Sequence, residues 1–185
     1  SALKKGAPYT SDHDLIIIGV GGVGMMGLQI AKAAFNCNPI VVDVDEEKLK
    51  LALENGASAA INPMDEDAMM KVFEITGGNA SVAIDFVGSE QSTAFGTSLL
   101  RKGGKYIIVG LYGGELKLPL PLIPIMERGV QGSYTGSPGD MHELMELVRS
   151  GKVDPSPVEK RPASQANQTL EDLKNGKRLG RAALM

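Results

Sequence analysis

Residues 15–24 constrain the fold of this chain more than any other stretch. A short apolar run, Leu15–Ile18, leads into Gly19, Gly21 and Gly24 with the spacing G-x-G-x-x-G, and a helical pattern follows directly. A glycine triplet alone is a weak signal, whereas a triplet between a strand and a helix is typical of a nucleotide-binding turn. The start of such a helix attracts phosphate through its free N–H groups and its positive dipole end.

Each glycine of this motif has its own physical role. Gly19 allows a tight turn out of the strand, Gly21 lets a pyrophosphate approach the backbone without a Cβ in the way, and Gly24 lets the helix pack closely on the strand. The N–H groups of Gly22 and Val23 then face the anion. We therefore assign all five of these residues to the predicted cofactor-binding turn.

An acidic residue ends the second expected strand, residues 40–44. Asp43 follows Gly19 by 24 residues, a position from which a carboxylate can accept hydrogen bonds from the hydroxyls of the adenosine ribose. Its charge would repel a 2′-phosphate, which favours NAD(H) over NADP(H). We assign Val44 to the same contact region, and Lys48, one helical turn further on, can reach a ribose hydroxyl.

Strands and helices alternate along the first part of the chain. We expect six strands, at Leu15–Ile18, 40–44, Ala59–Ile61, 82–87, 106–109 and 129–134. Helices are expected at Gly22–Phe35, after Asp45, at 65–75, and from Ser89 to a stop at Gly103-Gly104. In the first helix, Val23, Gly27 and Ile30 lie on the expected apolar face. The alternation predicts an α/β fold of the Rossmann type, a doubly wound parallel six-stranded sheet.

The ends of the fourth and fifth strands complete the predicted site. Phe86 and Val87 end the fourth strand, and Val109, Gly110 and Leu111 end the fifth. Ligands of such sheets bind in the crevice outside the carboxyl ends of the strands. These five residues should therefore line one crevice, along the span from adenine to nicotinamide.

The regular alternation of strands and helices ends after the fifth strand. Residues 116–125 contain three prolines, Ser137 can cap a helix that begins with Pro138, and a last helix (164–175) precedes a terminal strand (180–184). We expect residues 1–136 to form the nucleotide-binding domain. Residues 137–185 are expected to form a helix-and-strand appendage.

Composition and charge exclude several classes of protein. The net charge of −3 offers no basic surface for nucleic acid or an anionic membrane, and no apolar run is long enough to span a bilayer. The single cysteine, Cys37, allows neither a disulfide framework nor a CxxC metal site. His13 is expected in a loop and His142 on a helix surface. A cytoplasmic protein with no metal ligand set and no catalytic residue in this chain is the expectation.

Six motifs in a fixed order resemble a known family. They are GVGGVG (19–24), IVVD (40–43) with Lys48, IDFVG (84–88), GKYIIVGL (104–111), GSYTG (132–136) and GRAAL (180–184). The order is similar to that of the coenzyme-binding half of the zinc-dependent medium-chain alcohol dehydrogenases, in particular the NAD-dependent secondary-alcohol enzymes. The resemblance covers essentially the whole chain.

The resemblance implies further roles for individual residues. Val109 and Leu111 resemble positions whose backbone contacts the nicotinamide carboxamide, and Ser133 and Tyr134 correspond to a segment near the nicotinamide ring. Arg181 resembles a C-terminal arginine that pairs with the pyrophosphate, a task that suits a guanidinium group.

The resemblance also implies partners that this chain does not supply. Family members carry a separate catalytic domain with the zinc ligands and a proton relay, so we expect this chain alone to be inactive and residues 137–185 to pack toward that domain. A homodimer through the sheet edge is expected, with the proline-rich stretch before Gly129 in the contact.

Three alternatives stay open at this point. They are a zinc-independent quinone or enone reductase, a non-catalytic NAD(H)-sensing Rossmann module, and a methyltransferase with a similar glycine loop. The frequent NADP preference of the reductases conflicts with Asp43, and residues 180–184 do not form the antiparallel hairpin that usually ends a methyltransferase sheet.

Overall fold

A six-stranded parallel sheet forms the centre of the molecule. The computed structural model describes residues 1–9, 15–154, 158–175 and 181–185. The strand order is β3-β2-β1-β4-β5-β6, and every neighbouring pair is parallel. The strands are β1 (Leu15–Ile18), β2 (Ile40–Val42), β3 (Ala59–Ile61), β4 (Ala80–Asp85), β5 (Leu100–Ile108) and β6 (Gly129–Gly132). The predicted doubly wound α/β fold is thus confirmed.

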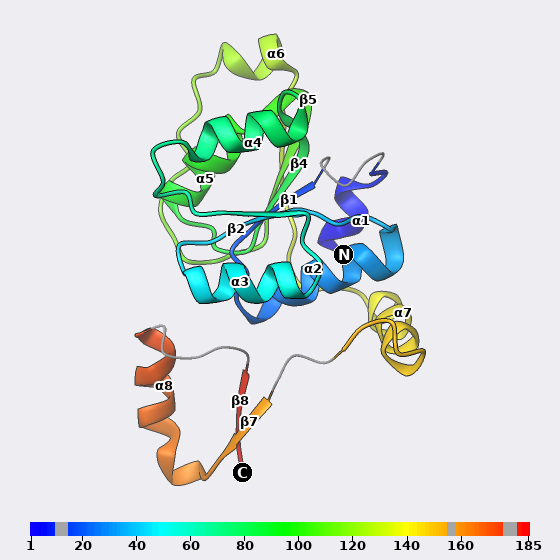
Figure 1. Ribbon diagram of the computed structural model, residues 1–185, viewed down its shortest axis with the longest axis vertical. Helices are drawn as coiled ribbons and strands as arrows, with labels where there is room; N and C mark the ends of the chain where they lie inside the picture. Colours follow the sequence, from blue (N-terminus) through cyan, green and yellow to red (C-terminus); the bar gives the residue numbers. More distant parts are fainter. Residues whose placement is uncertain (10–14, 155–157, 176–180) are drawn as a thin grey trace.

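Helices cover both faces of this sheet (Figure 1). One face carries α1 (Ala2–Gly6), α2 (Gly22–Phe35) and α3 (Glu46–Glu54), and the other carries α4 (Ala68–Thr76) and α5 (Glu90–Ser98). A short helix that the sequence did not predict, α6 (Leu122–Met126), follows Pro121 at the far end of the molecule. Pro124 lies in its first turn, where a backbone N–H would have no partner within the helix.

Two apolar clusters, one on each face, form the core. Leu15 and Ile17 of β1 pack with the α2 side, whereas Ile16 and Ile18 pack with the α4 and α5 side. All four residues of β1 are buried, which explains why this strand is apolar throughout and does not alternate.

The expected stop of the fourth helix at Gly103-Gly104 is wrong. Helix α5 already ends at Ser98, and β5 begins at Leu100. Leu100 pairs with Ala80, and the register shifts before Lys105 pairs with Val82. Gly103, with φ +77°, lies in this irregularity. The glycine pair therefore accommodates a bulge within the strand.

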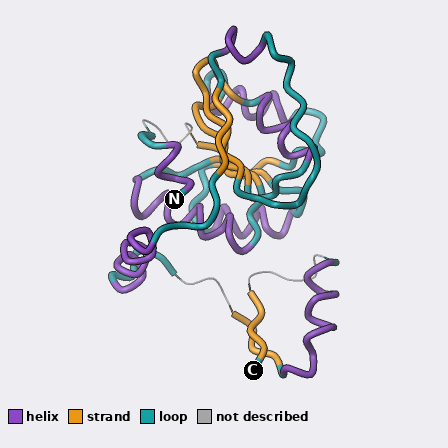
Figure 2. The backbone as a smooth tube through the Cα atoms, turned by 180° about the vertical axis from the view of Figure 1, so that it is seen from behind, coloured by secondary structure: helices purple, strands orange, loops and turns teal. Residues whose placement is uncertain are grey.

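The C-terminal part forms a second, smaller sheet. It follows α7 (Pro138–Arg149) and consists of β7 (Val158–Arg161), a short 3₁₀ turn (Ala163–Gln165), α8 (Ala166–Lys174) and β8 (Arg181–Leu184). β7 and β8 pair in parallel and lie apart from the six-stranded sheet (Figures 1 and 2). The helix-and-strand appendage is confirmed, while the division of the chain into two domains at residue 136 stays a prediction.

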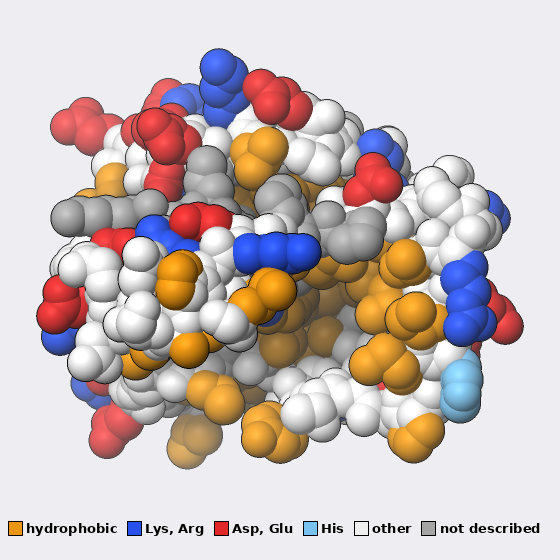
Figure 3. Space-filling view, turned by 90° about the horizontal axis from the view of Figure 1, so that it is seen from below, with side chains coloured by type: hydrophobic (Ala, Val, Ile, Leu, Met, Phe, Trp, Pro, Cys, Tyr) orange, Lys and Arg blue, Asp and Glu red, His pale blue; other side chains and the backbone are white. Residues whose placement is uncertain are grey.

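One hydrogen bond ties the chain before β7 to α2. Val153 is buried, and the Asp154 N–H donates to Gln29 Oε1 at 2.9 Å. Hydrophobic side chains gather at one side of the face shown in Figure 3, over α7, where Met141 and Met145 are exposed. His142 lies exposed on α7 as predicted, whereas His13 and Gly180 lie outside the described residues. No helix in the described part of the chain is long and apolar enough to cross a membrane.

Candidate nucleotide-binding site

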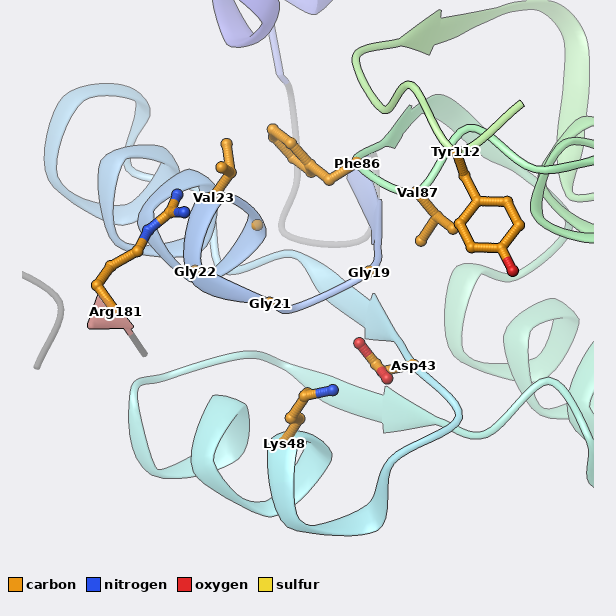
Figure 4. Close-up of a pocket in the computed structure, with 11 residues that line it drawn as sticks. Gly19, Gly21, Gly22, Val23, Asp43, Lys48, Phe86, Val87, Tyr112 and Arg181 are labelled. Atoms are coloured by element: carbon orange, nitrogen blue, oxygen red, sulfur yellow. The ribbon is translucent and has the colours of Figure 1, made fainter. Parts of the chain in front are cut away.

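A crevice of about 450 Å³ opens at the carboxyl ends of β1, β2 and β4 (Figure 4). This is where the sheet order changes direction between β1 and β4, the position at which open α/β sheets bind ligands. It is lined by Gly19, Gly21, Gly22, Val23, Gly24, Asp43, Lys48, Phe86, Val87, Tyr112 and Arg181. Ten of these eleven residues belong to the predicted site.

The three glycines of the motif differ in what surrounds them. A Cβ on Gly24 would lie 1.8 Å from the Gly19 carbonyl oxygen, so the helix touches the backbone of the turn here. Gly19 has φ +83°, and a Cβ there would meet the Val87 side chain at 2.6 Å. A Cβ on Gly21 would have no atom within 4 Å. Gly21 therefore leaves open space in front of the N-terminus of α2, as a cradle for phosphate requires.

The Asp43 carboxylate is tied to the glycine turn. Its Oδ2 accepts a hydrogen bond from the Val20 N–H at 2.8 Å, and its Oδ1 accepts one from the Asp45 N–H at 3.1 Å. A carboxylate has about four lone-pair positions. Two contacts thus orient the group and leave it able to accept further hydrogen bonds.

Lys48 approaches the crevice from the first turn of α3. Its Nζ lies 3.1 Å from Asp45 Oδ2, while Asp45 Oδ1 caps the helix by accepting from the Glu47 and Lys48 N–H groups. Burial alone would raise the pKa of the Asp45 carboxyl, but these contacts outweigh it and the pKa lies below its usual value. A bound ligand would share the Lys48 ammonium with Asp45.

Arg181 reaches the crevice from the C-terminal sheet. A Cβ on Gly22 would lie 2.7 Å from Arg181 Nε, so the guanidinium group covers the start of α2 (Figure 4). The positive end of a helix and a cation thus converge on one point. This arrangement suits an anion, because the free N–H groups at the start of α2 can donate hydrogen bonds to it and the positive charges attract it.

A buried carboxylate shapes the turn after β4. Asp85 Oδ1 accepts from the N–H groups of Val87 and Gly88 at 2.8 and 2.9 Å. Oδ2 accepts from the hydroxyls of Ser92 and Tyr106, both at 2.7 Å. Burial and the Asp85 carboxylate raise the pKa of Tyr106 well above its usual value. Asp85 is therefore a structural group, and it sets the backbone that carries Phe86 and Val87.

The remaining predicted residues lie elsewhere. Gly110 and Leu111 line a second cavity of about 310 Å³ beside the turn after β4. Val44 and Tyr134 are exposed, at 64% and 76%, outside the lining of both cavities. Val109 packs against the core and Ser133 is buried. The structure adds Tyr112, which sequence reasoning missed because it stands among loop glycines with no periodic pattern.

Sequence comparison then decides the family. A sequence model of the zinc-binding dehydrogenases matches residues 22–150. The chain belongs to this family. The matched segment begins inside the glycine turn and extends through α7, so it includes most of the residues that line the crevice. The family membership predicted from the motifs is confirmed.

Individual relatives agree with this assignment. The NAD-dependent alcohol dehydrogenase of Sulfurisphaera tokodaii is 38% identical over 186 residues, covering 100% of this chain and 53% of that protein. The enzyme of the same name from Sulfolobus acidocaldarius is 40% identical over 173 residues, covering 92% and 49%. The crystal structure of the alcohol dehydrogenase from the archaeon Aeropyrum pernix matches with a TM-score of 0.90 and 38% identity, covering 100% of this chain and 53% of that one. The chain spans about half the length of these relatives.

The described residues do not fit a zinc ion. Within 1–9, 15–154, 158–175 and 181–185, no three His, Cys, Asp or Glu side chains form a group that could hold a metal. The crevice instead offers hydrogen-bond donors, namely backbone N–H groups, one lysine and one arginine. These are partners for phosphate and hydroxyl oxygens.

Proposed function

We propose that this chain is the part of an NAD-dependent alcohol dehydrogenase that binds NAD(H). One observation carries the proposal: the open space at Gly21 lies between a cation at the start of α2 and an acid at the end of β2. This spacing of charge matches a pyrophosphate next to a ribose. The names of the relatives from Sulfurisphaera tokodaii and Sulfolobus acidocaldarius support the same cofactor.

The residues of the crevice would hold the dinucleotide in sections. The N–H groups of Gly22 and Val23 and the Arg181 guanidinium would bind the pyrophosphate. Asp43 would accept hydrogen bonds from the adenosine ribose, with Lys48 beside it. The nicotinamide ring, when bound, supplies a hydride acceptor or donor for the interconversion of an alcohol and a carbonyl compound. The task of this chain is to bind and orient the cofactor.

The contacts expected at the nicotinamide end belong to this proposal. Val109, Leu111, Ser133 and Tyr134 are proposed there because of the resemblance to the family, and Val44 at the ribose because of its place beside Asp43. The open side of the crevice would admit the reacting alcohol from the other half of the parent enzyme. We assign the zinc ion and proton relay of the family to that half.

Other functions have weaker support. A quinone or enone reductase that prefers NADP would have to place a 2′-phosphate beside Asp43, Asp45 and Glu46. A methyltransferase conflicts with the six-stranded sheet, in which every neighbouring pair of strands is parallel, and with the family assignment. A non-catalytic NAD(H) sensor shares every feature of the crevice and differs only in the absence of turnover by the full-length parent.

Titration calorimetry with NAD⁺, NADH, NADP⁺, NADPH and S-adenosylmethionine tests the proposal. NAD(H) should bind more tightly than NADP(H), because a 2′-phosphate would lie against the Asp43 carboxylate. Equal affinity for the two cofactors would refute the role of Asp43, and binding of S-adenosylmethionine alone would refute the dehydrogenase assignment.

Substitution of Asp43 sharpens this test. Asp43→Gly should reduce the preference for NAD(H), since it removes both the acceptor for the ribose and the repulsion of the phosphate. Glu54→Gln is a control, because it also removes one negative charge, at the opposite end of α3 from the crevice. If Asp43→Gly kept the preference for NAD(H), a residue other than Asp43 would have to make the ribose contact.

A further inference from the structure

The crevice has a chemical polarity along its length. Figure 4 shows Arg181 at one end and Tyr112 at the other, with Gly21, Gly19 and Asp43 between them. The first end is cationic and the middle carries a carboxylate. The last end is formed by the apolar Val87 and the aromatic Tyr112. This sequence of groups corresponds to phosphate, sugar and base in a nucleotide.

The backbone of Tyr112 is held firmly although its side chain is free. Its N–H donates to the Val87 carbonyl at 3.1 Å, and the Gly113 N–H donates to the Gly88 carbonyl at 3.0 Å. A Cβ on Gly110 would lie 2.1 Å from the Val87 carbonyl carbon, so the two turns are in backbone contact. Tyr112 itself is 82% exposed. The loop thus fixes the Tyr112 backbone beside the crevice and leaves the face of its aromatic ring exposed.

We propose that Tyr112 is the base-binding side chain of this site and stacks on the adenine of the dinucleotide. Stacking of an aromatic ring on a base contributes favourable binding free energy, and this contact needs no hydrogen bond to the base edge. The proposal rests on the proposed function, since it concerns the same cofactor. It adds a contact that confers affinity for the purine through Tyr112, next to the ribose contact of Asp43.

Adenosine diphosphate ribose is the probe for this proposal, because it contains the adenine and the pyrophosphate but lacks nicotinamide. Calorimetric titration of the 185-residue chain should show binding that is about tenfold weaker in Tyr112→Ala and changed by less than about twofold in Tyr112→Phe. Leu170→Ala, an exposed apolar residue on α8, should bind like the parent chain. Thermal unfolding without ligand should be the same in all four proteins.

The possible results separate the two proposals. If the parent chain binds the probe and Tyr112→Ala binds it equally well, the stacking contact is wrong and the proposed function stands. If Tyr112→Phe loses as much affinity as Tyr112→Ala, the hydroxyl and not the ring makes the contact, and stacking is again wrong. If the parent chain binds neither the probe nor NAD⁺ or NADH, the proposed function fails and the stacking proposal fails with it.

Discussion

Gly21 and Gly24 belong to one motif, yet they have different physical tasks. A Cβ on Gly21 would lie in open space, whereas a Cβ on Gly24 would lie 1.8 Å from the Gly19 carbonyl oxygen. Gly21 also has φ −66°, a value that any L-residue can adopt. The absence of a side chain at Gly24 therefore serves the fold. At Gly21 nothing in the fold requires the side chain to be absent. The space that a side chain would fill there can therefore hold a ligand.

The two alanine variants should separate stability from binding. Gly24→Ala should lower the free energy of unfolding by at least about 2 kcal/mol, because the methyl group overlaps a backbone carbonyl. Gly21→Ala should change it by less than about 1 kcal/mol but weaken NAD⁺ binding about tenfold. Urea unfolding and calorimetry measure both quantities. A Gly21→Ala chain with unchanged NAD⁺ affinity would argue against phosphate at this position.

At the level of elements, one carboxylate joins three parts of the fold. Asp85 ends β4, Ser92 lies in α5 and Tyr106 lies in β5, and the last two donate to the same oxygen of the first. The Tyr106 hydroxyl oxygen also lies 3.1 Å from the Ser92 carbonyl oxygen. A buried carboxylate is costly unless its lone pairs are filled. These contacts therefore fix the distance between α5 and the ends of β4 and β5.

Removal of the Tyr106 hydroxyl should show this role in stability. Tyr106→Phe should cost about 1.5–3 kcal/mol near neutral pH, the usual value for a hydrogen bond to a charged group. Because the pKa of Tyr106 is raised in the folded state, its contribution is present below the unfolded pKa of about 10 and is lost as the pH rises above it.

The alkaline range gives a second readout for the same variant. The parent chain should lose stability more steeply than Tyr106→Phe between about pH 9 and pH 11 in urea unfolding. Tyr9, whose pKa is also raised by burial, contributes equally to both proteins, so the difference reports Tyr106. Parallel curves for the two proteins would contradict this assignment.

At the level of the whole molecule, the sheet has one edge that the described residues leave uncovered. All four residues of β6 are exposed, and Leu120, Leu122 and Ile125 are exposed just before it. An edge strand with apolar neighbours is a template for pairing with another chain. This supports the predicted homodimer.

The cytoplasmic location stays a prediction.

Sedimentation of the chain tests the dimer. We expect a dimer for the parent chain and a monomer for Ile125→Asp, which places a charge in the proposed contact without a cost to the core, since Ile125 is 62% exposed. Met69→Asp, at a side chain of α4 that is 53% exposed, should stay dimeric. A parent chain that sediments as a monomer, or an Ile125→Asp chain that stays a dimer, would contradict this edge as the contact.

The sequence by itself determined the features that depend on neighbouring residues. The strand, glycine turn and helix at residues 15–35 were predictable because their turn chemistry and periodicity are local. The place of Asp43 at the end of a strand and the start of a helix after Asp45 follow from local patterns as well. The order of the motifs also sufficed for the family.

Only the tertiary structure decided the features that depend on distant packing. Helix α2 is apolar on more than one side, so periodicity selected its buried face only in part. Gly27 is buried as expected, whereas Val23, also expected inside, is 49% exposed. Met25 and Leu28 are buried instead. Close contact of Gly24 with Gly19 orients the helix. The resemblance to the family named Arg181, but only the fold brings it from a separate sheet to the start of α2. Tyr112 lies at the crevice because its N–H donates to the Val87 carbonyl of another loop. Such contacts join residues far apart in the chain, and no local pattern encodes them.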